Sequence, residues 1–275
     1  MSDFTSPWQG YDFSGLSAAL SRIQEITRPA LEALQNIQST LQPIVEALEQ
    51  YKPKVAEIGQ ALLQASRRFS AIRKMGDAQF VFWDYMTDEF VDAIVGAENI
   101  NKTLREQLIR DRFSAVNKTI DKTLSSAVMQ KHKRLYSQSV NAFRSGDSDL
   151  AVTGFTSVFD GLLADTSRNP TSRLGPRINA IKQKLDNDEL LNHDEYATIT
   201  LAMTLEKTLD SFSAPSDFKG KEPKGLNRHW IAHGRSTRKK TKLDCVKMIN
   251  LIYGLLLIGD LESTASSNSS CENGV

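Results

Sequence analysis

The chain of 275 residues is 40% hydrophobic and 24% charged, with a formal net charge of +1, as in a soluble globular protein of one large or two smaller domains. Its two cysteines, Cys245 in an apolar run and Cys271 in a polar tail, exclude a disulfide framework and favour a reducing compartment. The N-terminus lacks the features of a signal peptide, and the longest apolar run, residues 248–258, is shorter than the ~20 residues that span a bilayer. We therefore expect a cytoplasmic protein that does not contact a membrane.

A sustained heptad pattern of apolar and small residues runs from residue 20 to residue 72. Leu predominates in one row of the seam and Ile in the other, which in parallel coiled coils favours more than two strands. Pro29, Pro43 and Pro53 lie off the seam, but each tends to kink or end a helix. An intermolecular coiled coil and a helical hairpin folded back on the body both remain open. The two rows are Leu20, Thr27, Leu34, Leu41, Leu48, Val55, Leu62 and Phe69, and Ile23, Ala30, Ile37, Ile44, Tyr51, Ile58, Ala65 and Ile72.

Two further helical segments follow the heptad region. Residues 80–95 are rich in aromatic residues, and Phe82, Met86, Phe90 and Ile94 recur at the spacing of one helix face, typical of a packing surface. Residues 104–136 are polar and favour helix but contain few large apolar residues. We expect them to be exposed helices that connect an N-terminal region to a C-terminal one.

The C-terminal half has clearer helix boundaries. A short helix over residues 134–143 ends at Ser145-Gly146, and Asp147 or Ser148 can cap the next helix. In that helix Gly154 and Gly161 either allow close approach of a neighbouring helix or merely weaken it. Its apolar residues are Leu150, Val152, Phe155, Val158, Phe159, Leu162 and Leu163.

Helical patterns also cover residues 177–185, 196–212 and 243–261, and no stretch indicates strands. The sequence therefore predicts an all-α protein in which long amphipathic helices precede a helical bundle. The expected divisions are amphipathic, coiled-coil-like helices over 1–75, a helical connector over 76–124, a helical domain over 125–262 and a disordered tail over 263–275.

The strongest functional signal is the run from Asn227 to Gly234, which contains Arg228, His229 and His233. It lies in the most basic part of the chain, because residues 219–242 contain nine basic residues and one acidic residue, Glu222. Imidazoles transfer protons near neutral pH, and a fixed guanidinium suits a phosphate. The residues therefore indicate a site that handles phosphodiesters.

The spacing of these residues limits how they can act together. On a regular helix Arg228 and His233 lie about 140° apart, so joint use requires a helix terminus, a loop or a second chain. His229 and His233 are four residues apart and share a face, which also suits a metal pair. Because the neighbouring residues are basic and no third ligand or acid is near in sequence, we expect neither a metal nor another cofactor. A capped, solvated helix start with a structural histidine remains the competing interpretation.

The segment from Arg228 to His233 resembles the R-x-x-x-x-H signature of the HEPN superfamily (higher eukaryotes and prokaryotes nucleotide-binding), with His229 in the polar position after the Arg. The context is similar too. Residues 142–152 and 159–163 resemble the first helical pair of HEPN-like bacterial proteins, and residues 226–234 with the apolar helix after Lys242 resemble the last. The resemblance covers roughly residues 131–261.

The resemblance implies an all-α, HEPN-like bundle that forms a homodimer or higher homo-oligomer, with two copies of the motif facing each other. It also implies metal-independent endoribonuclease activity, often in phage defence or as a toxin. In that case His233 transfers the proton at the 2′-hydroxyl or the leaving oxygen, Arg228 stabilises the phosphate charge, and His229 assists. Asp160 either pairs with Arg228 or faces solvent. The residues expected to contact RNA phosphates are Arg235, Arg238, Lys239, Lys240 and Lys242.

Two hypotheses of different kinds remain. The first is an RNA-cleaving enzyme. The second is a non-catalytic helical scaffold that binds RNA or a protein, with the N-terminal helices as a further site for a protein partner. Both predict affinity for RNA, but only the first predicts turnover that survives chelation of metal ions.

Overall fold

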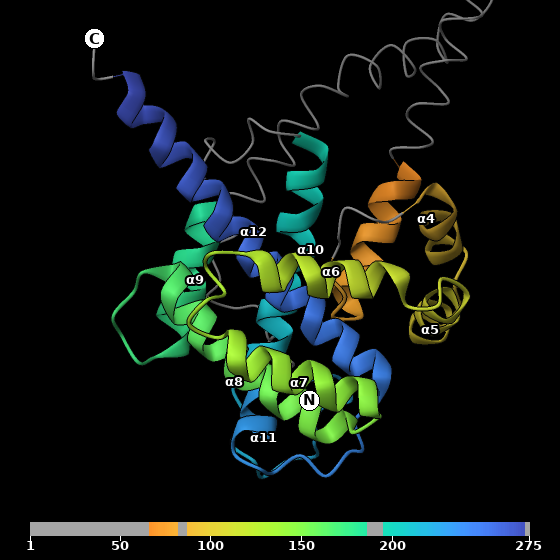
Figure 1. Ribbon diagram of the computed structural model, residues 1–275. Coiled ribbons are helices and arrows are strands. Elements are labelled where there is room, and N and C mark those ends of the chain that lie inside the picture. The colour runs from red at the N-terminus through yellow and green to blue at the C-terminus, as the bar shows by residue number, and fades with distance from the viewer. Residues whose placement is uncertain (1–65, 82–86, 186–194, 273–275) are drawn as a thin grey trace, which may run out of the picture. The chain divides into compact units, whose positions relative to one another are not determined.

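The computed structural model describes residues 66–81, 87–185 and 195–272 (Figure 1). Contacts group Ser66–Val275 into one compact unit, separate from Met1–Ala65. Nearly all of the heptad pattern of residues 20–72 therefore lies outside the described residues. The described elements are all helices, which confirms the all-α class. None of the helices searched in this part of the chain has the length and apolar character needed to cross a membrane.

The described part begins with a helix over residues 66–77. The predicted helices over 134–143, 177–185 and 196–212 are present as α7, α9 and α10. The labelled helices are α4 (Asp88–Val95), α5 (Ile100–Arg110), α6 (Ser114–Ser125), α7 (Lys133–Ser145), α8 (Ser148–Ser167), α9 (Leu174–Leu185), α10 (Glu195–Ser213), α11 (Arg228–Ala232) and α12 (Lys242–Glu272).

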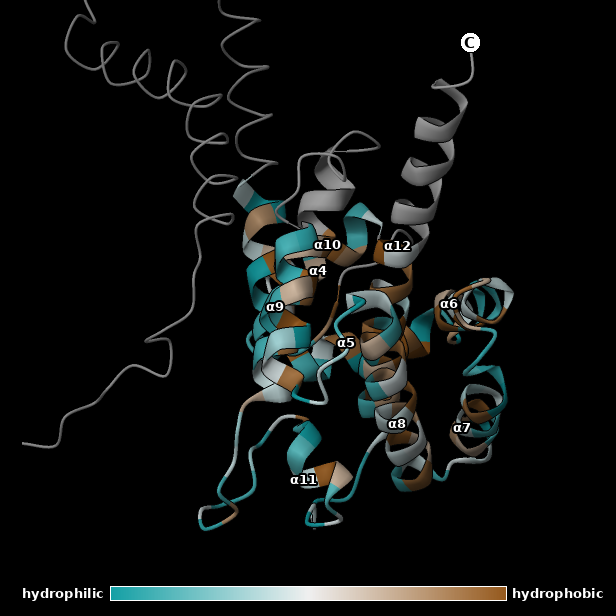
Figure 2. Ribbon diagram, turned by 90° about the vertical axis from the view of Figure 1, so that its left-hand side faces the viewer, coloured by the Kyte–Doolittle hydropathy of each residue, from teal (hydrophilic) through white to brown (hydrophobic). Residues whose placement is uncertain are grey.

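Helices α8 and α12 form the centre of the unit. They pack against each other, and α7 covers another side of α8. Phe155, Phe159 and Leu162 of α8 are fully buried, as are Ile249 and Ile252 of α12. Almost every residue of α12 between positions 243 and 258 is buried, because α5, α6, α8 and α10 all contact this helix. A helix that is apolar all round needs such cover. Figure 2 shows the hydrophobic residues along α8 and the first half of α12.

Residues 104–136 contribute to the core, contrary to the exposed connector expected from their polarity. Leu104 and Leu108 of α5 and Val116 and Ile120 of α6 are buried in the same cluster as α8 and α12. Each pair is spaced by four residues, so two apolar side chains are enough to form one buried stripe on each helix. The expected connector over 76–124 is thus part of the compact unit.

The contact between α7 and α8 is close at two glycines. A Cβ atom on Gly154 would lie 2.2 Å from Ser139 Oγ, and one on Gly161 would lie 2.6 Å from His132 Cε1. Of the two roles that the sequence left open for these glycines, the structure therefore shows the close approach of a neighbouring helix. Asp147 is the cap of α8, as one alternative predicted, and its side chain accepts a hydrogen bond from the backbone nitrogen of Leu150 at 3.2 Å.

Two predicted boundaries differ from the structure. Helix α12 continues to Glu272, past the end expected at Leu261, because no proline lies beyond Leu261 and Ser and Asn weaken a helix without ending it. In the aromatic segment 80–95, α4 begins only at Asp88, where Thr87 caps it. Phe82 and Met86 lie outside the described residues.

The segment that carries α11 is attached to the unit by Gln79. The side-chain Nε2 of Gln79 donates to the carbonyl oxygen of Leu226 at 2.7 Å, and its Oε1 accepts from the backbone nitrogen of Leu226 at 2.6 Å. Gly225 leaves room for this contact, since a Cβ there would lie 2.4 Å from Gln79 Oε1. Helix α11 itself contacts α8 and α10.

Candidate functional site

The start of α11 is defined by Asn227. Its Oδ1 accepts hydrogen bonds from the backbone nitrogens of His229 (3.0 Å) and Trp230 (3.2 Å), two of the groups that a helix start leaves unpaired. Its Nδ2 donates to the carbonyl oxygen of Ala214 at 3.0 Å, which ties the cap to the end of α10. Arg228 is therefore held at the first position of the helix.

Asp160 of α8 binds the guanidinium of Arg228. Nε of Arg228 lies 3.0 and 3.1 Å from the two carboxylate oxygens, and Nη2 lies 2.8 Å from Oδ2. The two side chains are only 24% and 28% exposed. The sequence left open whether Asp160 pairs or faces solvent, and the structure shows the pair. Nη1 of Arg228 takes no part in it, so the orientation of the guanidinium is set while one nitrogen remains for another acceptor.

His229 and His233 lie on one face, as their spacing predicted. Their ring centroids are 6.3 Å apart and the ring planes differ by 12°. His233 is the C-cap of α11 and is exposed, and Gly234 follows it with φ of 63°, a conformation that favours glycine. Because α11 has only five residues, Arg228 and His233 occupy its two ends, which meets the requirement for a helix terminus.

The pKa of His229 is lowered. Partial burial is the main cause, and the charges of Arg228 and His233 act in the same direction, while a backbone contact with Ser213 and the charge of Asp160 oppose them. A lowered pKa keeps His229 neutral at neutral pH, so it can hydrogen-bond to its surroundings but adds no positive charge to the site.

Phe218 contacts the proposed site, although no motif in the sequence points to it. Its ring lies 5.5 Å from that of His233 and 5.5 Å from that of Trp230, both edge-on. The guanidinium of Arg235 lies 4.9 Å above the same ring, within the range of a cation–π contact. The available signal was an aromatic residue in a loop otherwise rich in Pro, Gly, Ser and Lys.

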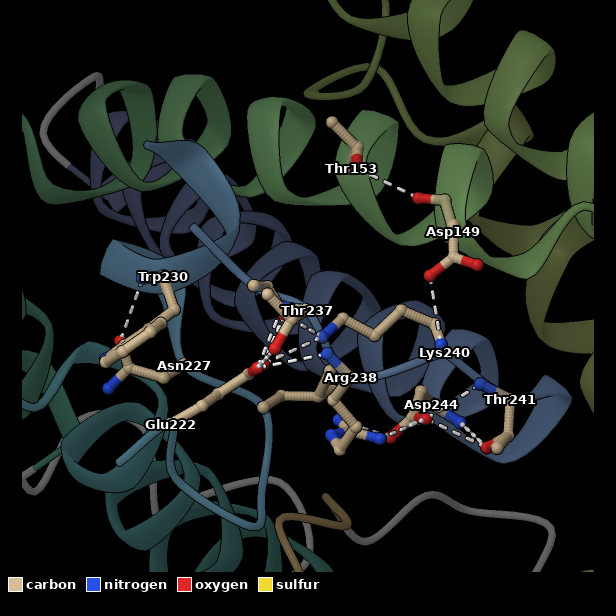
Figure 3. A network of polar contacts seen from close by, with 12 residues as sticks. Asp149, Thr153, Glu222, Asn227, Trp230, Thr237, Arg238, Lys240, Thr241 and Asp244 are labelled. Carbon is tan, nitrogen blue, oxygen red and sulfur yellow. Dashed lines mark hydrogen bonds and ion pairs between the residues drawn. The ribbon is translucent and has the colours of Figure 1, made fainter. Parts of the chain in front are cut away.

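Glu222, the one acidic residue of the basic segment, organises the loop after α11 (Figure 3). It accepts hydrogen bonds from the backbone nitrogens of Thr237 (2.8 Å) and Arg238 (3.0 Å) and from Ser236 Oγ, and Lys240 Nζ lies 3.3 Å from Oε1. Burial raises the pKa of Glu222, but these hydrogen bonds and the charge of Lys240 outweigh it and lower the pKa from 4.5 to about 2.

The five basic residues expected at RNA phosphates divide into two groups. Arg238 pairs with Asp244 at 3.0 Å, and the side chain of Lys240 is only 5% exposed beside Glu222. These two stabilise the loop and the start of α12. The other three, Arg235, Lys239 and Lys242, are exposed.

In the part of the chain that the structure describes, no group of three His, Cys, Asp or Glu residues is arranged to hold a metal ion. Comparison of the chain with protein-family models, curated proteins and solved structures found no match. The resemblance to the HEPN superfamily therefore rests on the motif and on the order of the helices around it.

Proposed function

We propose that the protein is a metal-independent endoribonuclease of the HEPN type. The observation that carries the proposal is the arrangement of α11, in which Asp160 orients Arg228 at one end and the exposed ring of His233 stacks on His229 at the other. RNA contains its own nucleophile, the 2′-hydroxyl. Cleavage then requires proton transfer and stabilisation of charge on the phosphate, which an imidazole and a guanidinium supply.

In the proposed reaction His233 accepts the proton of the 2′-hydroxyl as its oxygen attacks phosphorus. The bond to the 5′-oxygen breaks, and this leaving oxygen receives a proton from water, while His233 returns its proton to solvent. The Arg228 that faces this His233 across the shared site belongs to a second copy of the motif. Arg228 binds a phosphate oxygen through the nitrogen that Asp160 does not use. The products are a 2′,3′-cyclic phosphate and a free 5′-hydroxyl. The exposed Arg235, Lys239 and Lys242 bind neighbouring phosphates.

A non-catalytic RNA- or protein-binding scaffold is the second candidate. The pair between Arg228 and Asp160 favours it, because Arg228 has a structural partner whether or not RNA is present. In that case the motif fastens α11 to α8, and the exposed cations bind a ligand without cleavage.

Cleavage of mixed RNA in excess EDTA separates these candidates. We expect the wild type to cut RNA but not DNA and to leave 2′,3′-cyclic phosphates. The rate of cleavage by His233→Ala should be about 100-fold or more below that of the wild type. His132→Gln is the matched control, because His132 lies outside the motif and pairs with Asp165. A requirement for magnesium, 5′-phosphate products or full activity of His233→Ala would contradict the proposal.

The composite nature of the site has its own test. Light scattering should show a homodimer of the full chain. Arg228→Ala and His233→Ala are each expected to be inactive alone. Mixing the two variants should restore part of the cleavage rate, since each chain then supplies the group that the other lacks. A monomer at about 10 μM, or no recovery on mixing, would show that the site is not shared between chains.

A further inference from the structure

A cavity of about 450 Å³, open to solvent on one side, lies between parts of the chain that are distant in sequence. Its walls come from the end of the first described helix, from α5, from Ser211 of α10, from residues 223–226, and from Arg238 and the start of α12. Neither Arg228 nor His233 lines it, so it is separate from the candidate ribonuclease site. Its volume lies within the range of about 300–1,000 Å³ that is usual for small-molecule sites.

The cavity has an excess of positive charge. Four basic and two acidic residues line it, and both acids are already paired. Asp77 pairs with Lys207, which is not part of the wall, and Asp244 accepts hydrogen bonds from Arg238 and from the backbone and side chain of Thr241. The remaining cations are Arg105, Lys224 and Lys247, and within the described residues none of them forms an ion pair with a carboxylate.

Lys247 is the most constrained of these cations. It is 6% exposed, and its Nζ donates to the neutral amide oxygen of Asn101 at 2.8 Å. A lysine ammonium has three donors, and burying it without a counter-ion is unfavourable. Burial is the main cause that lowers the pKa of Lys247 to about 8, and Arg238 adds to the effect while Asp244 opposes it. A negatively charged group inside the cavity would supply the missing counter-charge.

The rest of the wall favours a ligand that also has an apolar part. Leu226 and Leu243 line the cavity and are nearly buried, and Pro223 lies beside them. Arg105 and Lys224 are exposed and come from separate elements, α5 and the loop before α11. A phosphate group placed between these cations would leave the remainder of the molecule in contact with the apolar wall.

We propose that this cavity binds a small phosphate-bearing molecule of about the size of a nucleoside monophosphate, with Arg105, Lys224 and Lys247 as the groups that recognise the phosphate. The proposal is independent of the ribonuclease activity, because no residue of the Arg–His motif takes part. Since Lys224 and Leu226 directly precede the cap of α11, the ligand would contact the segment that positions the motif.

Isothermal titration calorimetry of the full chain, without RNA, tests the proposal. The probes are inorganic phosphate, pyrophosphate, adenosine monophosphate and adenosine. We expect adenosine monophosphate to bind, the inorganic anions to bind more weakly and adenosine not to bind. Lys224→Ala and Arg105→Ala should each weaken binding about 10-fold, the loss typical of one charge-assisted contact. Both residues are exposed, so neither variant should impair folding.

Lys221→Ala is the matched control, because Lys221 is an exposed cation of the same loop that does not line the cavity. The proposal is overturned if no phosphate-bearing probe binds at about 1 mM, or if Lys221→Ala weakens binding as much as Lys224→Ala. The proposal would also be overturned if a 5′-phosphorylated RNA bound and none of the small probes did. The ligand of the cavity would then be the 5′ end of an RNA and not a small molecule.

The pH dependence of binding separates Lys247 from the surface cations. Phosphate monoesters stay dianionic above pH 7.5, so affinity should be level up to about pH 8 and fall above it as Lys247 loses its proton. The other charged groups of the wall are Asp77, Arg105, Lys224, Arg238 and Asp244. Lys247→Met, which keeps an unbranched side chain of similar length but removes the charge, should bind more weakly and lose the fall above pH 8. An unchanged pH profile in this variant would remove Lys247 from the site.

Discussion

At α11 the carboxylate of Asp160 decides how the guanidinium of Arg228 is presented. Arg228 would otherwise be a long, mobile side chain at a helix start, and ordering it would cost conformational entropy. The two-nitrogen contact with Asp160 fixes its plane before any ligand arrives. A preorientated cation stabilises developing charge more effectively than one that must be ordered during the reaction.

The first prediction concerns this pair. Asp160→Asn removes the charge but keeps the shape, and we expect the rate of RNA cleavage to fall about 10-fold because Arg228 is no longer oriented. Arg228→Lys should not restore a rate lost in Arg228→Ala, since an ammonium lacks the planar fork. The control is Asp165→Asn on the same helix, where Asp165 pairs with His132 instead. Equal rates for Asp160→Asn and the wild type would show that the pair is only structural.

The second prediction concerns Glu222. In Glu222→Gln, Lys240 becomes a buried cation without a counter-ion and several donors lose a charged acceptor, so the free energy of unfolding should fall by about 3 kcal/mol at pH 7. Urea denaturation with circular dichroism measures this loss. Glu106→Gln, an exposed glutamate of α5, should change stability little.

The stability contributed by Glu222 also depends on pH. Its pKa in the folded protein, about 2, lies below the ordinary 4.5, so the contribution is complete above about pH 4.5 and is lost as pH falls toward 2. Between pH 5 and pH 3 the wild type should therefore lose more stability than Glu222→Gln. Parallel curves for the two proteins would show that this carboxylate is not held in its charged form by the loop.

At the scale of helices, the contact of α7 with α8 depends on the absence of a side chain at Gly154. The third prediction is that Gly154→Ala destabilises the protein by about 1–3 kcal/mol, because the new methyl group would overlap Ser139 Oγ. In a Ser139→Ala background the same change should cost less or become stabilising, since alanine is a better helix former by about 1 kcal/mol. Thermal unfolding of the four proteins of this cycle measures the coupling.

Gly175→Ala is the control for that cycle. Gly175 is also helical, in α9, but nothing lies within 4 Å of the position where its Cβ would be. This substitution should therefore leave stability unchanged or raise it slightly. Equal effects at Gly154 and Gly175 would show that helix propensity, and not packing between α7 and α8, determines the result.

At the scale of the whole molecule, the described helices share one core that includes α5 and α6. The fourth prediction is that a fragment of residues 66–275 unfolds cooperatively in urea. A fragment of residues 125–275 should be markedly less stable, because it lacks Leu104, Leu108, Val116 and Ile120 and exposes the part of α12 that they cover. Similar midpoints for the two fragments would mean that the C-terminal helices fold without this cover.

Periodicity and capping rules predicted much of the C-terminal helical order. The helices around residues 134–143, 177–185 and 196–212 follow from their apolar spacing, and the start of α8 follows from Asp147. These features are local, since a cap or a stripe is complete within a few residues. The buried position of α5 and α6 does not follow from the sequence, because two apolar residues in a polar helix do not reveal that another helix, α12, needs cover on every side.

The sequence by itself also determined the motif, its place in the most basic segment and the need for a helix terminus to bring Arg228 and His233 into use. Only the tertiary structure decided which basic side chains are paired with carboxylates and which remain free to bind a ligand. Asp160 is 68 residues from Arg228, and Glu222 neutralises Lys240 across 18 residues. The cavity combines segments of the first described helix, α5, α10, the loop before α11 and α12, which are distant along the chain. The energy of a charge depends on what surrounds it in space, so residues of identical type in one basic run become an oriented guanidinium, a buried ion pair or an exposed cation only when the helices pack.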